Sequence, residues 1–171
     1  ERVARGVADL AVSYPPLGQA WDGVVHEVAE EEVRLVVPRD DPLCGQEQVR
    51  LEQLADRAWV RCAMEPVVDG VPFLDLVCGR AGFVPRTVVR AGHTTTSARI
   101  AAAGAGIGLV PAAIAELVAP ARQVLRMDPV WRRPVVALSR AEPTGAAAAF
   151  VALLRGDRPG QAGGGSGECA A

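Results

Sequence analysis

The segment from Thr94 to Pro111, TTTSARIAAAGAGIGLVP, constrains the fold more than any other part of this chain. Its opening hydroxyl residues suit the start of a helix, because they can cap free amide groups there. Gly104 and Gly106 allow the positive φ angles with which helices end. Residues 107–110 then predict a short buried strand, and the proline that follows suits the first turn of another helix. The segment therefore predicts a helix, a glycine turn and a strand, in that order.

The three glycines of this segment, Gly104, Gly106 and Gly108, also invite comparison with a dinucleotide-binding loop. Such a loop needs a strand before its glycines and a helix after them, so that the pyrophosphate meets a helix N-terminus. Here the helix comes first and the strand second. The pattern therefore predicts a helix-to-strand turn in a layered domain, and no nucleotide cofactor.

Composition narrows the class of protein. The chain has 171 residues, half of them hydrophobic, which is enough for one α/β domain or two small lobes. A formal net charge of −2 does not indicate the basic surface that nucleic-acid binding requires. The absence of a long apolar stretch or a leader predicts a soluble, cytoplasmic protein with no membrane partner. Because the chain opens at Glu1 without a methionine, we expect a fragment that lacks its upstream part.

Three of the four cysteines, Cys44, Cys62 and Cys78, lie in apolar or semi-apolar segments with spacings unlike those of zinc ligands. They are predicted to be buried free thiols, as is usual in a reducing compartment, with disulfide bonds as the alternative. The sequence therefore predicts neither a metal site nor any other cofactor.

Short strands and helices alternate along the chain and predict an α/β fold with mostly parallel sheets. Residues 24–29 and 33–38 are predicted as two short strands, with Glu30–Glu32 forming a solvated turn between them. Irregular connections near 38–50 and 119–133 suggest that the chain crosses between lobes and returns. We expect residues 1–45 and 120–155 to form lobe I, residues 46–119 to form lobe II, and the Gly-rich tail 156–171 to be disordered.

Several segments in order resemble the effector-binding domain of LysR-type transcriptional regulators. These are VARGVADLAV, VPRDDPLCG, VRLEQLADRAWV, SARIAAAGAGIGLVPAAI and the closing RRPVVALSR with AFVALLR. Together they extend over residues 3–155, and their order and spacing carry more weight than any one of them.

The resemblance implies a two-lobed, type 2 periplasmic-binding-protein-like fold that binds a small effector, anionic or aromatic, between its lobes. It implies no enzymatic activity. It also implies that the full-length regulator is a homo-oligomer that contacts DNA only through an N-terminal winged-helix domain outside this chain. The first strand and helix of lobe I would precede Glu1, and we expect their loss to lower stability.

In such a fold, ligands contact the carboxyl ends of strands and the starts of helices. His93, Thr94 and Thr95 lie where a helix of lobe II would begin and are candidates for binding an anionic group. Plain helix capping is the alternative. Ser13 and Tyr14 end the first visible strand and are candidate effector contacts, although Tyr14 could equally pack on the two prolines that follow it.

Arg61 and Cys62 end the predicted strand of residues 58–62, and Arg61 is a candidate to bind an acidic effector in a bidentate manner, through two of its guanidinium nitrogens. An exposed arginine at a strand end is the alternative. Phe83 is a candidate wall of the binding site, with core packing as the competing interpretation.

Two other functions remain open from the sequence alone: a dehydratase-type enzyme and a solute-binding receptor on the same fold. No catalytic triad is visible. His26 lies in an alternating strand and is expected to be exposed, while Asp40 and Asp41 precede a proline and are explained by turn formation.

Overall fold

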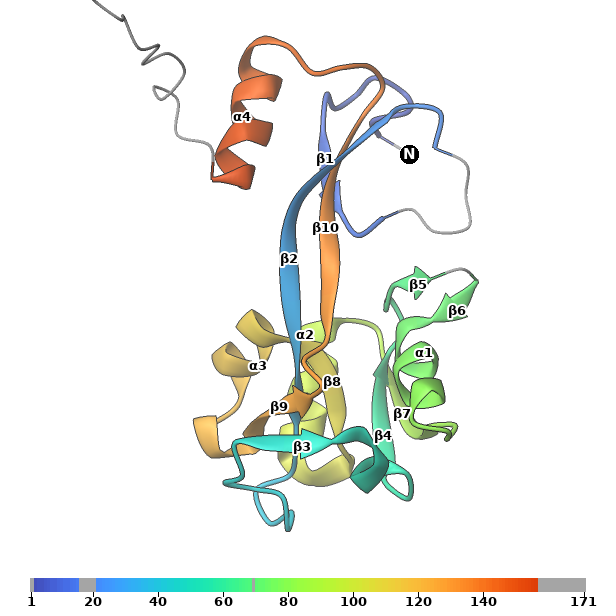
Figure 1. Cartoon of the computed structure of the whole chain (residues 1–171), viewed down its shortest axis with the longest axis vertical. Helices are drawn as coiled ribbons and strands as arrows, with labels where there is room; N and C mark the ends of the chain where they lie inside the picture. The colour runs from blue at the N-terminus through green and yellow to red at the C-terminus, as the bar shows by residue number, and fades with distance from the viewer. Residues whose placement is uncertain (1, 16–20, 69, 157–171) are drawn as a thin grey trace, which may run out of the picture. The chain divides into compact units, whose positions relative to one another are not determined.

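The computed structural model describes residues 2–15, 21–68 and 70–156 (Figure 1). These residues form two compact units: unit 1 holds the described part of 1–15, 21–29 and 134–171, and unit 2 holds the described part of 30–133. The boundaries between the two units therefore lie between residues 29 and 30 and between residues 133 and 134. The lobes expected from the sequence have their boundaries between residues 45 and 46 and between residues 119 and 120. The lobe boundaries stay a prediction. The expected disordered tail, 156–171, lies outside the described residues except for Gly156.

In unit 1, two strands from opposite ends of the sequence lie side by side. Strand β1 (Ala11–Ser13) pairs antiparallel with β10 (Arg132–Ser139). If the two ends of the chain share lobe I, residues 134–140 are expected to lie beside residues 7–13, and this pairing confirms it. The apolar residues Val7, Leu10 and Val12 also predict a strand that includes Val7, but Val7 lies outside β1 and is 63% exposed. The reason is local: its amide bonds to the carbonyl of Arg2, so the chain turns here before β1 begins.

Helix α4 (Gly145–Arg155) closes unit 1. Its Val151 is buried against Val28 of β2 and Ala137 of β10. The helix ends at Gly156, whose φ of 80° places it in the left-handed conformation that commonly terminates helices. The run AAAAFVALLR over 146–155 predicts a closing helix, and the structure confirms it.

The acidic run Glu30–Glu32 does not form a turn. It lies inside one continuous strand, β2 (Val24–Val36), which replaces the two short strands expected from the sequence. The charges are accommodated because Glu32 has cationic partners: its carboxylate lies 2.7 Å from the Arg34 side chain and 3.3 Å from that of Arg126. Because these arginines offset the negative charge of Glu32, the acidic run can continue the strand and need not form a solvated turn.

Strands β2, β8 and β9 give unit 2 an antiparallel centre. β2 pairs antiparallel with β8 and β9, whereas β9 pairs in parallel with β3, and β4 pairs in parallel with β7. The expectation of mostly parallel sheets is therefore wrong, because the segments that return to β2 run against it. The strands of unit 2 besides β2 are β3 (Gln48–Arg50), β4 (Ala58–Cys62), β5 (Val67–Val68), β6 (Val71–Pro72), β7 (Arg86–Ala91), β8 (Gly108–Pro111) and β9 (Val124–Asp128).

The helices of unit 2 are short. The apolar residues at positions 51, 54, 55 and 58 predict a short amphipathic helix over 51–57, but the chain forms only a 3₁₀ turn there, which buries Leu51 and Leu54. The helical segments are η1 (Leu51–Leu54), α1 (Phe73–Arg80), α2 (Thr94–Ile100), η2 (Ala101–Ala105), α3 (Ala112–Val118) and η3 (Ala121–Gln123).

The glycine-marked segment adopts the order of elements predicted from its sequence: α2 and η2, then β8, then α3. Gly104 has φ 113° and ends the helical part. Gly106, with φ 155°, lies against β4, where an added Cβ would come within 2.6 Å of the Ala58 carbonyl oxygen. Only glycine fits at this position, because any side chain would collide with the backbone of the neighbouring strand.

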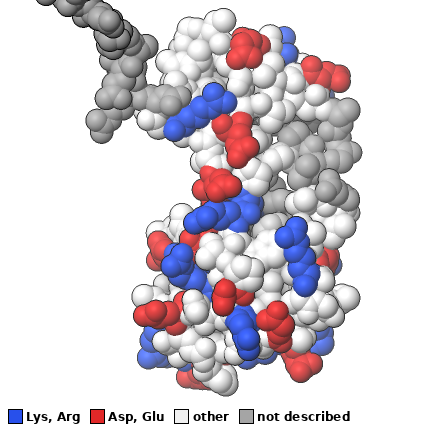
Figure 2. Space-filling model, viewed as in Figure 1, with Lys and Arg blue, Asp and Glu red and all other residues white. Residues whose placement is uncertain are grey.

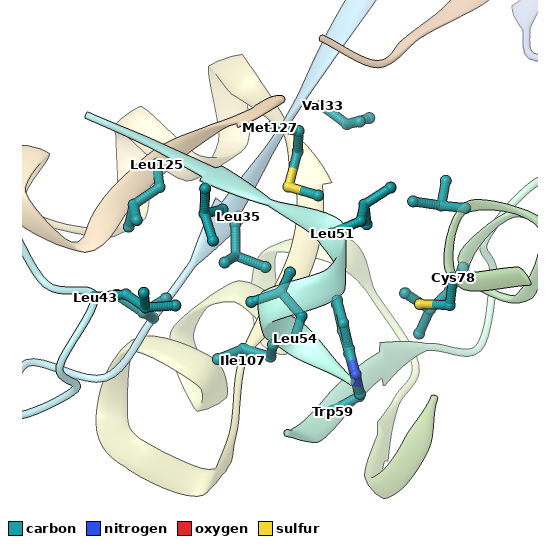
Figure 3. Packing of buried hydrophobic residues seen from close by; sticks show 14 of the residues in the cluster. Val33, Leu35, Leu43, Leu51, Leu54, Trp59, Cys78, Ile107, Leu125 and Met127 are labelled. Carbon is teal, nitrogen blue, oxygen red and sulfur yellow. The ribbon is translucent and has the colours of Figure 1, made fainter. Parts of the chain in front are cut away.

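The main hydrophobic core lies in unit 2 and surrounds Trp59, which is fully buried. Figure 3 shows aliphatic side chains from β2, η1 and β9 converging on this interior. Trp131 packs at its margin, with its ring edge-on to Phe73 at 6.2 Å and the Arg80 guanidinium 4.9 Å from its ring centre. This rigid core supports the strands whose ends carry the candidate site.

Candidate functional site

The carboxyl ends of β4 and β7 meet at one edge of unit 2. The two strands pair in parallel with Cys62 opposite Ala91, and the amide of Ala63 donates to the Ala91 carbonyl over 2.7 Å. Helix α2 begins at Thr94, three residues after β7 ends. Side chains that leave β4 and side chains at the start of α2 are therefore brought to the same edge.

Cys62 and Thr94 are in direct contact, with 3.5 Å between the thiol sulfur and the hydroxyl oxygen. Thr94 is held from behind by Ser97, which is almost fully buried and donates its hydroxyl to the Thr94 carbonyl over 2.8 Å. The amide of Ser97 bonds to the carbonyl of His93, which starts the helix. The structure thus brings together two of the residues selected from the sequence and fixes the backbone beneath them.

His93 and Thr95 flank this contact. His93 occupies the N-cap position and is exposed, but its side chain makes no capping hydrogen bond. Thr95 is half-buried. Helix capping by His93 is therefore absent, and as effector contacts His93 and Thr95 stay predictions.

Arg61 has its cationic group engaged within the protein. The side chain is 7% exposed, its Nε lies 2.6 Å from Glu65, and its terminal nitrogen lies 2.6 Å from Asp75 of α1. The expectation of an exposed strand-end arginine is wrong, because these two carboxylates hold the guanidinium inside. An acidic effector would reach this cation only by replacing one of them.

Burial is the largest influence on Glu65 and raises the pKa of its carboxyl, and Asp75 also raises it. A hydrogen bond from the Leu74 amide, 2.9 Å long, acts in the opposite direction, as does the charge of Arg61. Glu65 therefore joins the end of β4 to the start of α1 through one carboxylate. Sequence reasoning missed Glu65 and Asp75, although the four-residue spacing from Arg61 to Glu65 was a usable signal.

The remaining sequence-derived candidates lie elsewhere. Phe83 packs against the main core of unit 2, as the competing interpretation had it, and its amide bonds to the Cys78 carbonyl. Ser13 ends β1 in unit 1 and is exposed, while Tyr14 is half-buried. As effector contacts, these three residues stay predictions.

His26 is buried rather than exposed. It lies on β2 within unit 1 with 8% of its surface exposed, and its Nε2 is 3.9 Å from the Glu142 carboxylate. The alternating pattern misled the sequence analysis because this face of the strand is covered within unit 1. Asp41 behaves as expected of a turn residue: it accepts a hydrogen bond from the Leu43 amide over 2.9 Å and forms an ion pair with Arg57.

The cysteines of the described residues are free, as expected, with Cys62 and Cys78 buried and Cys44 half-buried. Burial raises the pKa of the Cys78 thiol to about 12, which suppresses its reactive thiolate form. Within the ranges that the structure describes, no three metal-binding side chains gather into a cluster. None of the helices described is both long and apolar enough to span a bilayer. On the face shown in Figure 2, basic and acidic side chains are interspersed, with no broad basic patch.

Comparison with known proteins identifies the class. The LysR substrate binding domain family matches residues 1–158, and the chain belongs to this family. Its fold is the type 2 periplasmic-binding-protein-like fold, so the predicted fold class is confirmed. Domains of this family belong to transcriptional regulators, and relatives are known in complex with small molecules. No curated protein matches the chain.

Three solved structures illustrate the similarity. The C-terminal domain of a probable LysR family transcriptional regulator from Rhodococcus sp. RHA1 is 24% identical, with a TM-score of 0.69 over 90% of this chain and 77% of that one. The CcmR regulatory domain of Synechocystis PCC6803, in complex with 2-PG, is 17% identical, with a TM-score of 0.71 over 94% and 78%. The effector binding domain of QuiR, in complex with shikimate, is 18% identical, with a TM-score of 0.67 over 90% and 73%.

Proposed function

We propose that this chain is the effector-sensing domain of a LysR-type transcriptional regulator and that it binds a small metabolite at the joined ends of β4 and β7. The observation that carries the proposal is the contact of Cys62 with Thr94, which forms where a strand end and a helix start meet. Ligands of α/β folds bind at such edges. Membership of the family supports a sensory role over a catalytic one.

The effector is a small anionic or aromatic metabolite. Thr94 and Thr95 offer hydroxyl donors to it, and His93 offers an exposed imidazole. Arg61 supplies positive charge from inside the protein and reaches the ligand where an acid group of the ligand takes the place of Glu65 or Asp75. No covalent step is involved, so occupancy itself is the signal.

At the level of the whole regulator, we propose that effector binding controls a DNA-binding domain attached N-terminally, across a homo-oligomer in the cytoplasm. A ligand shifts such an equilibrium only by its different affinity for the two states. Contacts that the effector makes with Thr94 must therefore differ between the active and inactive forms.

A binding assay with one matched pair of variants tests the site. Purified chain is titrated with 2-PG, shikimate and benzoate, and stabilisation is followed as a rise in melting temperature, which binding to the folded state produces by mass action. We expect at least one of these probes to stabilise the chain. We expect Thr94→Val to weaken that binding about tenfold, because a hydrogen bond to a charged group is lost.

Thr96→Val is the control, because Thr96 lies on the same helix and is exposed. It should bind the probe as the unmodified chain does. If Thr94→Val and Thr96→Val bind equally well, the site is not at this edge, and if none of the three probes stabilises the chain, the proposed effector class is wrong.

A further inference from the structure

A hollow lies in unit 1 where β10 ends and α4 begins. Its volume is about 520 Å³, within the range of small-molecule sites. Residues 139–144, the first turn of α4 and Asp9 line it. All of these residues belong to unit 1, whereas Cys62 and Thr94 belong to unit 2.

Part of the lining carries hydrogen-bond donors. Thr144 occupies the N-cap of the 11-residue helix α4, but its side chain makes no capping bond. Ala146 and Ala147 lie in the first turn of the helix and line the hollow, and amides in a first turn have no partner within the helix. The Arg140 guanidinium adds a positive charge and lies against Gly6, where an added Cβ would be 3.3 Å from it.

A buried polar side chain in the wall is unsatisfied. Ser139 lines the hollow with 3% of its surface exposed, and its hydroxyl has no hydrogen-bond partner within the described residues. Buried hydroxyl groups are normally hydrogen-bonded, because leaving one without a partner costs free energy. The hydroxyl is itself enclosed by protein atoms, so it is an unsatisfied polar group within the wall of the hollow.

The lining also includes two acidic residues, Asp9 and Glu142, and the Glu142 carboxylate lies 3.9 Å from His26 Nε2. The remaining lining residues are apolar: Ala141, Pro143 and the two alanines of α4. A simple anion would meet the two carboxylates, and a simple cation would meet the helix start and Arg140.

We propose that this hollow is a second ligand site that binds a zwitterion of the amino-acid class. The ligand carboxylate binds the first amides of α4 and Arg140. The ligand ammonium group binds Asp9 and Glu142, and the ligand side chain lies against the apolar lining residues.

Three compounds that differ only in their charged groups test this assignment. L-Leucine carries both groups, 4-methylpentanoate lacks the ammonium group, and 3-methylbutylamine lacks the carboxylate. Binding is followed by nuclear magnetic resonance through the amide signals of Ala146 and Ala147 in the intact chain. We expect saturable shifts with L-leucine and at least tenfold weaker binding of each analogue, since each charged contact accounts for a factor of about ten.

Two variants and two controls complete the design. Arg140→Gln should weaken L-leucine binding at least tenfold, while Arg39→Gln, at an exposed position in unit 2, should leave it unchanged. Asp9→Asn should reduce the preference for L-leucine over 4-methylpentanoate, because it removes a partner of the ammonium group alone. Thr94→Val should have no effect, which separates this site from the proposed effector site.

Failure of L-leucine to produce saturable shifts overturns the proposal. So does equal binding of L-leucine and either analogue, because the hollow would then not recognise a zwitterion. Loss of L-leucine binding in Thr94→Val would also overturn it, since the ligand would then occupy the surface in unit 2.

Discussion

Replacing Arg61 by methionine removes the cation from a largely buried ion-pair cluster and leaves two carboxylates behind. Arg61 is 7% exposed, Glu65 is 15% exposed and Asp75 is 31% exposed. Breaking a buried pair by removing one partner costs about 3 to 5 kcal/mol. Because Asp75 is partly solvated, we expect a loss near the lower end, about 3 kcal/mol at pH 7. That is a large fraction of the stability of a small domain.

The stability lost in Arg61→Met should be smaller at acidic pH, and the direction of this pH dependence follows from the pKa of Glu65. Burial raises the pKa of this carboxyl above its ordinary value of 4.5, and the charge of Arg61 opposes that rise. Folding then favours the protonated form, so this group reduces stability as pH rises from the unfolded pKa through the folded one. Removing Arg61 raises the folded pKa further. The variant should therefore lose more stability at pH 7 than at pH 5.

Urea unfolding followed by tryptophan fluorescence measures the effect, because Trp59 and Trp131 both lie in unit 2. A loss of 3 kcal/mol corresponds to a midpoint shift of about 1.5 M for a typical denaturant dependence. Arg86→Met, at an exposed position on β7, is the control and should shift the midpoint little.

A double variant tests the assigned cause. Adding Glu65→Gln to Arg61→Met should recover at least half of the lost stability, because glutamine keeps an acceptor for the Leu74 amide without a buried charge. The reasoning is refuted if Arg61→Met and Arg86→Met shift the midpoint equally, or if the loss is the same at pH 5 and pH 7.

Three further outcomes are expected. Gly106→Ala should lower the free energy of unfolding, measured in urea, by about 2 kcal/mol, because its Cβ would lie 2.6 Å from the Ala58 carbonyl oxygen. Gly79→Ala, at an open position in helix α1, should be neutral or stabilising by about 0.5 kcal/mol, and equal effects of the two substitutions would contradict the clash. Cys78, with a pKa of about 12, should resist alkylation by iodoacetamide at pH 8 in the folded chain and react after unfolding, as mass spectrometry of its peptide would show. Asp41→Ala should lower stability by about 1 to 2 kcal/mol through loss of the bond from Leu43 and the pair with Arg57, and an unchanged urea midpoint would count against it.

Local sequence signals predicted most elements of unit 2. The strand at 58–62 and the helix, turn and strand between Thr94 and Pro111 appear as expected, because glycine freedom, helix capping and apolar runs act over a few residues. The pairing of β10 with β1 was also anticipated. These features depend on short-range chemistry or on the order of motifs.

The errors arose where distant residues decide the outcome. Glu30–Glu32 has the composition of a turn, yet the run extends a strand because Arg126, about a hundred residues later, supplies a counter-charge. Strand direction was misjudged for the same reason: which segments return beside β2 is a tertiary property. Burial of His26 likewise depends on residues from the other end of the chain.

The candidate site shows the same division. Cys62 and Thr94 could both be selected from the sequence, because one ends a predicted strand and the other begins a predicted helix, and ligands bind at such positions in this kind of fold. The engagement of Arg61 could not be predicted, because its partner Asp75 lies on a helix whose packing no local pattern specifies. The sequence shows a cation, Arg61, at the end of the strand, but only the folded structure shows that Glu65 and Asp75 already form ion pairs with it.

The contacts behind Thr94 indicate how occupancy at this edge would be felt elsewhere in unit 2. Ser97 holds the Thr94 carbonyl, and α2 continues directly into η2. From there, the buried Gln123 amide donates to the carbonyls of Ala102, in η2, and Val37, just after β2, over 3.0 and 2.8 Å. Because a buried amide cannot give up either bond without cost, a shift of α2 must move Gln123 or the end of β2 with it. One buried side chain thus bonds both to η2, which continues α2, and to the residue that follows β2.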